Sequence, residues 1–154
     1  MHHITIVLEN IRSALNVGAI MRTCDAAAVE KLFLLGITPY PPHNKIPKTA
    51  LGAENSIKWE YIKEYQNFEF LPKQPTLGIE IVKNAKNLFD FNFPKPCTII
   101  FGNEISGISP QMLQICDQII KIPMYGSKES LNVATSAGII IYNIINQWHH
   151  DQNN

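Results

Sequence analysis

Cysteine, arginine and net charge are all scarce in this sequence. The three cysteines, Cys24, Cys97 and Cys116, are odd in number, far apart and without a C-x-x-C pair. That spacing excludes a secreted disulfide framework and favours a reducing compartment. Thirteen Lys and Arg balance thirteen Asp and Glu, so no global positive field indicates nucleic acid. Such binding would have to depend on local features.

Long apolar runs and targeting signals are also missing. No apolar run approaches the length that crosses a membrane. The opening MHHITIVLEN has neither the basic region nor the apolar region of a secretory signal peptide. We therefore expect a soluble, cytoplasmic protein with no membrane partner. The histidine pairs His2-His3 and His149-His150 lie at the termini, where surface histidines are common, so we expect no metal site.

The composition itself is typical of one folded domain. A chain of 154 residues can bury a real core but leaves no room for a second globular domain, so we expect a single domain spanning residues 1–154. Hydrophobic residues make up 45% of the chain and charged residues 17%. Because that charged fraction is low for a soluble surface, we expect some apolar surface to be buried against a partner subunit.

Short apolar runs between turn signals predict an α/β fold with a parallel sheet. We expect strands at residues 4–8, 32–35, 59–62, 76–81, 98–101 and 119–122. The aromatic residues Trp59, Tyr61, Tyr65 and Phe68 are expected in the core, with base stacking as the alternative.

Helices are predicted between these strands. Ile20, Cys24, Ala27 and Ala28 share one face of a helix at residues 16–29. A short helix is expected at 49–53, and Ser109-Pro110 predicts another helix start. Residues 132–148 lack proline and are apolar almost all round, so this last helix needs cover on several sides.

The first candidate site is the segment NIRSALNVGAIMRTC at residues 10–24. It follows the first predicted strand directly, where open α/β sheets place ligand crevices. Both arginines, Arg12 and Arg22, lie in it, and Arg suits phosphate recognition. Arg22 lies roughly 200° around the helix from buried Ile20, so its guanidinium can face a crevice. The alternative is a surface ion pair between Arg22 and Asp25.

The second and third candidates are loops. FGNEISGISP, residues 101–110, has neither a dinucleotide fingerprint nor a P-loop pattern, so a phosphate cradle is not expected. Its alternative is a tight turn in which the glycines supply positive φ and Glu104 caps a neighbouring amide. In IPMYGSKESLNVATSAG, residues 122–138, Ser130 to Asn132 lie at the mouth of the last helix, where backbone amides are free. Ser130 is the expected N-cap.

Together the three segments resemble the motifs of the SpoU or TrmH-type branch of the SPOUT RNA 2'-O-ribose methyltransferases. Motif one is seen in Asn10 with LNVGAIMRTC, motif two in IIFGNEISGIS, and motif three in IKIPMYGSKESLNVATSAGIIIY. Their order and separation match, and with the intervening strands they span essentially the full chain.

The resemblance implies a fold, an assembly and a cofactor. It implies a deep trefoil knot formed by the C-terminal third, and an obligate homodimer in which Arg22 of one subunit meets cofactor held by the other. The implied cofactor is S-adenosylmethionine, without a metal. The implied catalytic residues are Arg22, Asn16, Glu104, Ser130 and Asn132, and the implied cofactor-binding residues are Leu77, Gly78, Ile79, Phe101, Gly102, Asn103, Ile122, Met124, Ser130 and Leu131.

The implied substrate is RNA, with tRNA favoured over rRNA and no DNA partner. Methyl transfer to a ribose hydroxyl needs an oxygen that is deprotonated or nearly so. The resemblance makes Arg22 the base, but an ordinary arginine stays protonated, so Arg22 could instead position the phosphate and ribose. Glu104 is the competing base. The rival functions are an inactive, knotted RNA-binding module and a generic nucleotide-binding domain.

Overall fold

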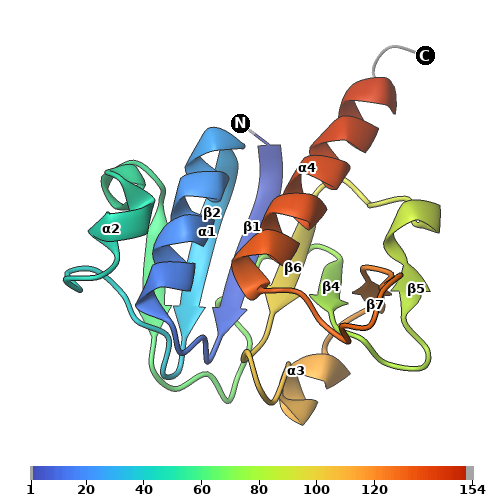
Figure 1. The fold of residues 1–154 in the computed structure, drawn as a ribbon, viewed down its shortest axis with the longest axis horizontal. Helices are drawn as coiled ribbons and strands as arrows, with labels where there is room; N and C mark the ends of the chain where they lie inside the picture. Colours follow the sequence, from blue (N-terminus) through green and yellow to red (C-terminus); the bar gives the residue numbers. More distant parts are fainter. Residues whose placement is uncertain (1, 152–154) are drawn as a thin grey trace.

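A seven-stranded sheet forms the centre of the molecule, in the strand order β3-β2-β1-β6-β4-β7-β5. The computed structural model describes residues 2–151, and every strand pairing within this sheet is parallel (Figure 1). The strands are β1 (His2–Glu9), β2 (Val29–Leu35), β3 (Trp59–Ile62), β4 (Thr76–Ile79), β5 (Lys86–Asn87), β6 (Cys97–Phe101) and β7 (Gln118–Lys121).

Helices cover both faces of this sheet. They are α1 (Ala14–Ala26), α2 (Pro47–Ala50), α3 (Pro110–Gln114) and α4 (Val133–Asp151), with short 3-10 turns η1 (Ala53–Asn55) and η2 (Leu88–Asp90). The two long helices, α1 and α4, lie side by side over one face (Figure 1). No helix within residues 2–151 is long and apolar enough to cross a membrane.

The predicted parallel α/β architecture is confirmed, and the remaining differences are local. The strand predicted at residues 59–62 has those bounds, whereas the first helix ends at Ala26 and not at Val29. Ala28 has a left-handed backbone, with φ 50, and its side chain is exposed. The chain must turn here because the next residue, Val29, pairs with β1. The short helix predicted at residues 49–53 is α2, which ends at Ala50, three residues earlier than predicted.

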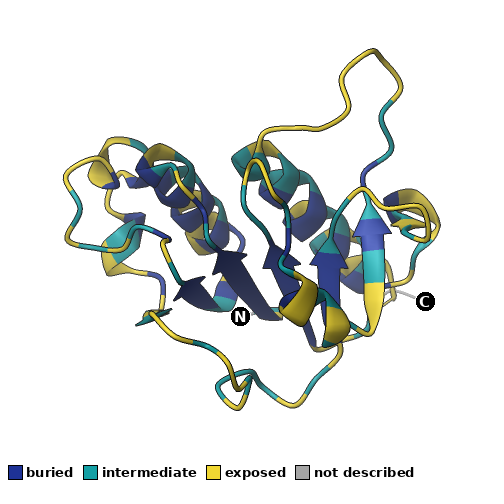
Figure 2. Cartoon of the chain, turned by 90° about the horizontal axis from the view of Figure 1, so that it is seen from below, coloured by how far each residue is buried: buried dark blue, intermediate teal, exposed yellow. Residues whose placement is uncertain are grey.

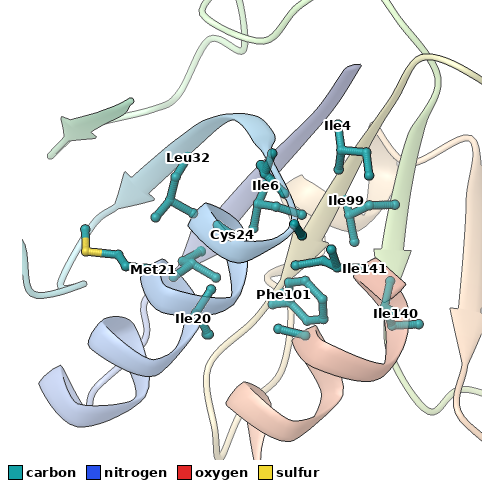
Figure 3. Close-up of a cluster of buried hydrophobic side chains, with 14 of the residues drawn as sticks. Ile4, Ile6, Ile20, Met21, Cys24, Leu32, Ile99, Phe101, Ile140 and Ile141 are labelled. Atoms are coloured by element: carbon teal, nitrogen blue, oxygen red, sulfur yellow. The ribbon is translucent and has the colours of Figure 1, made fainter. Parts of the chain in front are cut away.

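Alternation along the strands divides the core into two layers. Ile4, Ile6 and Leu8 of β1 face α1 and α4, whereas Val7 points to the other face. This follows from the two-residue period of a strand. The larger layer includes Ile20, Cys24, Ile99, Phe101, Ile140 and Ile141 (Figure 3). Figure 2 shows buried residues concentrated in the strands and on the inward sides of the helices.

The second layer is covered by α3 and by the chain that follows β3. Met112 of α3 packs there with Ile100, and Tyr65 and Phe68 lie against the same cluster. Tyr61 instead packs against the larger layer. The expectation that the aromatic residues after position 58 are largely core is therefore confirmed for these side chains, all of which are partly buried.

Helix α4 is packed on only one side within this chain. It buries Ala137, Ile140, Ile141, Ile144 and Trp148, and it packs beside α1. Tyr142, on the opposite side, remains 50% exposed. The apolar surface of this helix is thus mostly, but not wholly, satisfied within the chain.

Candidate active site

A cleft of about 420 Å³ opens where β4, β6 and β7 end. Because parallel strands have their carboxyl ends at one edge of the sheet, the loops that follow them converge there. The cleft is lined by Ile79, Glu80, Ile81, Phe101, Gly102, Asn103, Glu104, Ile105, Gly107, Lys121, Ile122, Met124, Ser130, Leu131, Asn132, Val133 and Ser136.

All the predicted cofactor-binding residues line this cleft except Leu77 and Gly78. Leu77 is buried in the core beneath the sheet's edge. A Cβ added to Gly78 would lie 3.0 Å from the side chain of Ile119 and 3.1 Å from those of Cys116 and Ile108, so this glycine faces neighbouring core atoms. Within β4, only the terminal residue, Ile79, reaches the cleft.

Close packing explains both glycines of the loop after β6. Gly107 has φ +73, a left-handed conformation that favours glycine. A Cβ on Gly102 would lie 2.3 Å from the carbonyl carbon of Gly107, too near for any side chain. The backbones of Asn103 and Gly107 exchange hydrogen bonds of 3.0 and 2.9 Å, so the loop folds back on itself and projects Glu104.

Glu104 joins this loop to the start of α1. Its carboxylate accepts hydrogen bonds from the backbone amide of Arg12 at 2.9 and 3.1 Å, and from that of Ser13 at 3.2 Å. The Asn16 side chain donates another at 3.3 Å. Glu104 therefore does cap backbone amides, as predicted. These amides belong to the first candidate segment, residues 10–24, and not to the turn that carries Glu104.

These donors keep Glu104 ionised. Partial burial raises the pKa of Glu104. The hydrogen bonds from the backbone amides of Arg12, of Glu104 itself and of Ser13 lower it by more, so the net pKa is below the ordinary value. A carboxylate in this state is a weak proton acceptor at neutral pH. Its contacts suit a positioning role.

Asn132 connects α4 to the same constellation. Its side-chain amide donates to Asn16 Oδ1 at 3.1 Å, and its Oδ1 accepts from the amides of Ala134 and Thr135. Asn132 is therefore the N-cap of α4, and the prediction that Ser130 caps this helix is wrong. Ser130 is exposed and lines the cleft.

Arg22 lies apart from the other predicted catalytic residues. It is exposed on α1 and does not line the cleft, and its side chain makes no hydrogen bond or ion pair with any described residue. The alternative ion pair with Asp25 is likewise absent from residues 2–151. The structure thus brings together Asn16, Glu104 and Asn132, with Ser130 at the cleft wall, and leaves Arg22 outside.

Glu80 is a cleft residue that the sequence analysis missed. It follows β4 directly, and its carboxylate accepts from the amide of Ile108 at 3.0 Å. The sequence analysis placed Glu80 inside the strand predicted at residues 76–81, whereas β4 ends at Ile79 and Glu80 begins the loop beyond it, where ligand sites form. Within residues 2–151, no group of three or more His, Cys, Asp or Glu side chains is arranged to hold a metal ion.

The fold and cleft together define a parallel α/β protein with a cleft at the carboxyl edge of its sheet. The family follows from comparison: the chain belongs to the SpoU rRNA Methylase family, whose model matches residues 3–142. A relative from Aquifex aeolicus, named tRNA (guanosine(18)-2'-O)-methyltransferase, is 36% identical over 141 residues. The match covers 87% of this chain and 64% of that relative, so the chain spans less than two thirds of its length.

Solved structures with the same fold include proteins of this family. The A. aeolicus TrmH/SpoU tRNA modifying enzyme superimposes with a TM-score of 0.85 at 26% identity, covering 99% of this chain and 78% of that one. The SpoU methyltransferase AviRb from Streptomyces viridochromogenes, in complex with the cofactor AdoMet, superimposes with a TM-score of 0.84 at 25% identity. That match covers 95% of this chain and 60% of AviRb.

Proposed function

We propose that this chain transfers a methyl group from S-adenosylmethionine to a ribose 2'-hydroxyl of RNA, with tRNA as the substrate. The observation that carries this proposal is the hydrogen-bonded line from Asn132 through Asn16 to Glu104 at the cleft. The name of the A. aeolicus relative supports tRNA. The family's description supports rRNA as the alternative.

The cleft suits the proposed cofactor in size and chemistry. Its volume, about 420 Å³, lies in the range of small-molecule sites, roughly 300–1,000 Å³. Phe101, Ile122 and Met124 offer apolar surface for a purine ring, and the carboxylate of Glu80 offers a negative charge. When bound, S-adenosylmethionine supplies a methyl group on a positively charged sulfur. Asn103 and Leu131 also line the cleft.

The chain's own residues orient the acceptor ribose. The Asn132 side chain donates a hydrogen bond to that of Asn16, and Asn16 in turn donates one to the Glu104 carboxylate. The remaining amide groups can then hydrogen-bond the ribose hydroxyls in one orientation, which lowers the entropic part of the barrier. Glu104, held as a carboxylate, anchors the loop and does not take the proton. Arg22 binds phosphate and ribose through its planar guanidinium.

A homodimer completes this site in the proposal. Leu15 of α1 is 44% exposed and Tyr142 of α4 is 50% exposed, and Arg22 projects from the same helix as Leu15. Exposed apolar side chains on two adjacent helices support a contact with a second copy. In that assembly Arg22 of one subunit meets the cleft of the other, which explains its separation from the cleft within one chain.

The chain's path supports the proposed trefoil knot. β7 lies on the far side of β4 from β6, whereas α4 packs against α1. The segment at residues 122–132 must therefore return across the ends of β4 and β6. On the way it meets the connection that leaves β4 at Glu80, adds β5 (Lys86–Asn87) to the edge of the sheet and joins β6 at Cys97. We propose that it threads this connection, with residues 1–154 forming one domain.

Residues 31–53 form a candidate surface for RNA. From Lys31 to Ala53 the sequence holds three lysines and no acidic residue. Lys45 and Lys48 are exposed there, and so is the ring of Tyr40. Cations beside an exposed aromatic ring suit a nucleic acid backbone and its bases. The proposed location is the cytoplasm, where tRNA is modified, without DNA or a membrane as partner.

Titration calorimetry with three ligands tests the cofactor assignment. We expect S-adenosylmethionine to bind at about one molecule per chain, because the cleft is one site formed by one set of loops. ATP and NAD should show no binding at this site. Binding of ATP or NAD without S-adenosylmethionine would favour the generic nucleotide-binding domain. RNA binding without methyl transfer would favour the inactive module.

A further inference from the structure

A buried carboxylate, Glu9, holds the end of one cleft loop. Glu9 is only 1% exposed and lies at the end of β1. It accepts hydrogen bonds from the backbone amide of Ser109 at 2.8 Å and from the Ser109 hydroxyl at 2.5 Å. The Tyr65 hydroxyl donates a third at 2.9 Å. The end of the loop at residues 102–109 is thus fixed to the end of β1.

The next residue, Asn10, carries a second set of bonds. Its backbone is left-handed, with φ 54, a conformation that needs support in a residue other than glycine. The Asn103 side chain donates to its carbonyl at 2.7 Å, and the Ile37 amide donates to its Oδ1 at 3.1 Å. Its Nδ2 donates to the Tyr65 hydroxyl at 3.0 Å.

One hydroxyl therefore serves both residues. Tyr65 donates to Glu9 and accepts from Asn10, and it is the only described side chain to bond both. It comes from the segment after β3, packs in the second core layer and does not line the cleft. Burial and the nearby Glu9 raise the pKa of Tyr65 to about 12, so the hydroxyl keeps its proton near neutral pH.

We propose that Tyr65 is a positioning residue for methyl transfer, which sets the spacing between residues 9–16 and the loop at residues 102–109. The proposal rests on the proposed function. Through Asn10 it controls Asn103, which lines the cleft and bonds the Asn10 carbonyl. The same loop carries Glu104, which anchors Asn16. Without the hydroxyl, a buried carboxylate and an amide each lose a partner, and the loops shift to compensate.

Tyr65→Phe is the test, with Tyr61→Phe as the matched control. The Tyr61 hydroxyl is also partly buried and donates one hydrogen bond, to the Gly36 carbonyl at 2.7 Å, but it bonds neither Glu9 nor Asn10. We expect both variants to fold with similar losses in Tm. Tyr65→Phe should lower kcat about tenfold, the effect of about 1.4 kcal/mol on a barrier. Tyr61→Phe should keep kcat within about twofold of the wild type.

Glu9→Gln is the second variant, because it alters the acceptor of the Tyr65 hydrogen bond instead of the donor. The double variant Tyr65→Phe with Glu9→Gln should be little worse than either alone, since coupled residues are not additive. Fully additive losses in kcat, or normal turnover by Tyr65→Phe, would overturn the positioning role.

Hydrogen exchange supplies a readout that needs neither cofactor nor RNA. The Ser109 amide, which donates to Glu9, should exchange faster in Tyr65→Phe than in Tyr61→Phe, because the loop opens more easily. Equal exchange in the two variants would overturn the proposal even if the protein had another activity. An inactive wild type with the expected exchange difference would instead count against the proposed function alone.

Discussion

Replacing Glu104 with glutamine removes the negative charge that holds the cleft loop to the start of α1. In the native chain the carboxylate accepts from the amides of Arg12 and Ser13 and from the Asn16 side chain. Glutamine has nearly the same shape but only one acceptor oxygen, and its amino group would face backbone donors. We expect the loop to loosen and Asn16 to lose its anchor.

The size of the effect distinguishes positioning from proton transfer. A hydrogen bond to a charged group contributes about 1.5–3 kcal/mol, and solvent around the exposed Glu104 favours the lower end. A loss of about 1.4 kcal/mol lowers a rate about tenfold. Removing a general base typically costs about 10²–10⁴ in rate. Glu104→Gln should therefore lower kcat about tenfold.

The pH dependence has a definite sign. The pKa of Glu104 in the folded protein is below the ordinary value of 4.5. Its stabilisation is therefore fully present above that value and is lost as the pH falls through the folded pKa. The difference in Tm between wild type and Glu104→Gln should stay constant near neutral pH and shrink in acid.

Steady-state kinetics and thermal unfolding, each measured across pH, provide the assay. The positioning role predicts a modest fall in kcat together with a lower Tm, and no ionisation of Glu104 in the neutral pH–rate profile. A loss of a hundredfold or more with unchanged Tm would refute this reasoning and make Glu104 the base. An ionisation near neutral pH in the wild-type pH–rate profile that is missing from Glu104→Gln would likewise make Glu104 the base.

Three further substitutions test other parts of the account. Arg22→Ala and Arg22→Lys should both abolish turnover while calorimetry finds normal S-adenosylmethionine affinity, because Arg22 is assigned to RNA and an ammonium lacks the planar fork; near-normal turnover would remove it from the mechanism. Tyr142→Glu should give a folded monomer by light scattering and circular dichroism. Ile140 is fully buried within the chain, so Ile140→Glu should unfold it. A dimeric, active Tyr142→Glu would exclude the proposed interface. Asn132→Ala should lower stability by about 1 kcal/mol through loss of the α4 cap, and an unchanged Tm would contradict that role.

Periodicity was a good guide to the sheet. Five of the six predicted strands are short apolar runs. Four of them, β1, β2, β4 and β6, are mostly buried in the parallel sheet, whereas β7 is only partly buried. β5 escaped prediction because two residues, Lys86 and Asn87, carry no period. The strand order is also invisible in periodicity, since β7 inserts between β4 and β5 through long-range pairing alone.

The candidate site was predictable as a set of segments but not as a geometry. Two of the three segments line one cleft, and the first is joined to them by the hydrogen bonds of Asn16 with Glu104 and Asn132. Ser130 and Asn132 are two residues apart, and both can cap a helix. Only the structure shows that Asn132 does so. Glu9 and Tyr65 are 56 residues apart, and no local pattern links them. The helical angle of Arg22 correctly predicted its exposure, but exposure does not specify which surface it meets.

Nucleoside mass spectrometry of unmodified tRNA, incubated with the purified chain and S-adenosylmethionine, tests the central claim most directly. The account predicts one ribose-methylated nucleoside, formed by the wild type and not by Arg22→Ala. rRNA treated in parallel should gain no methyl group. A methyl group on a base, or no methylated nucleoside in either RNA despite bound S-adenosylmethionine, would contradict the proposal that this cleft methylates a ribose 2'-hydroxyl.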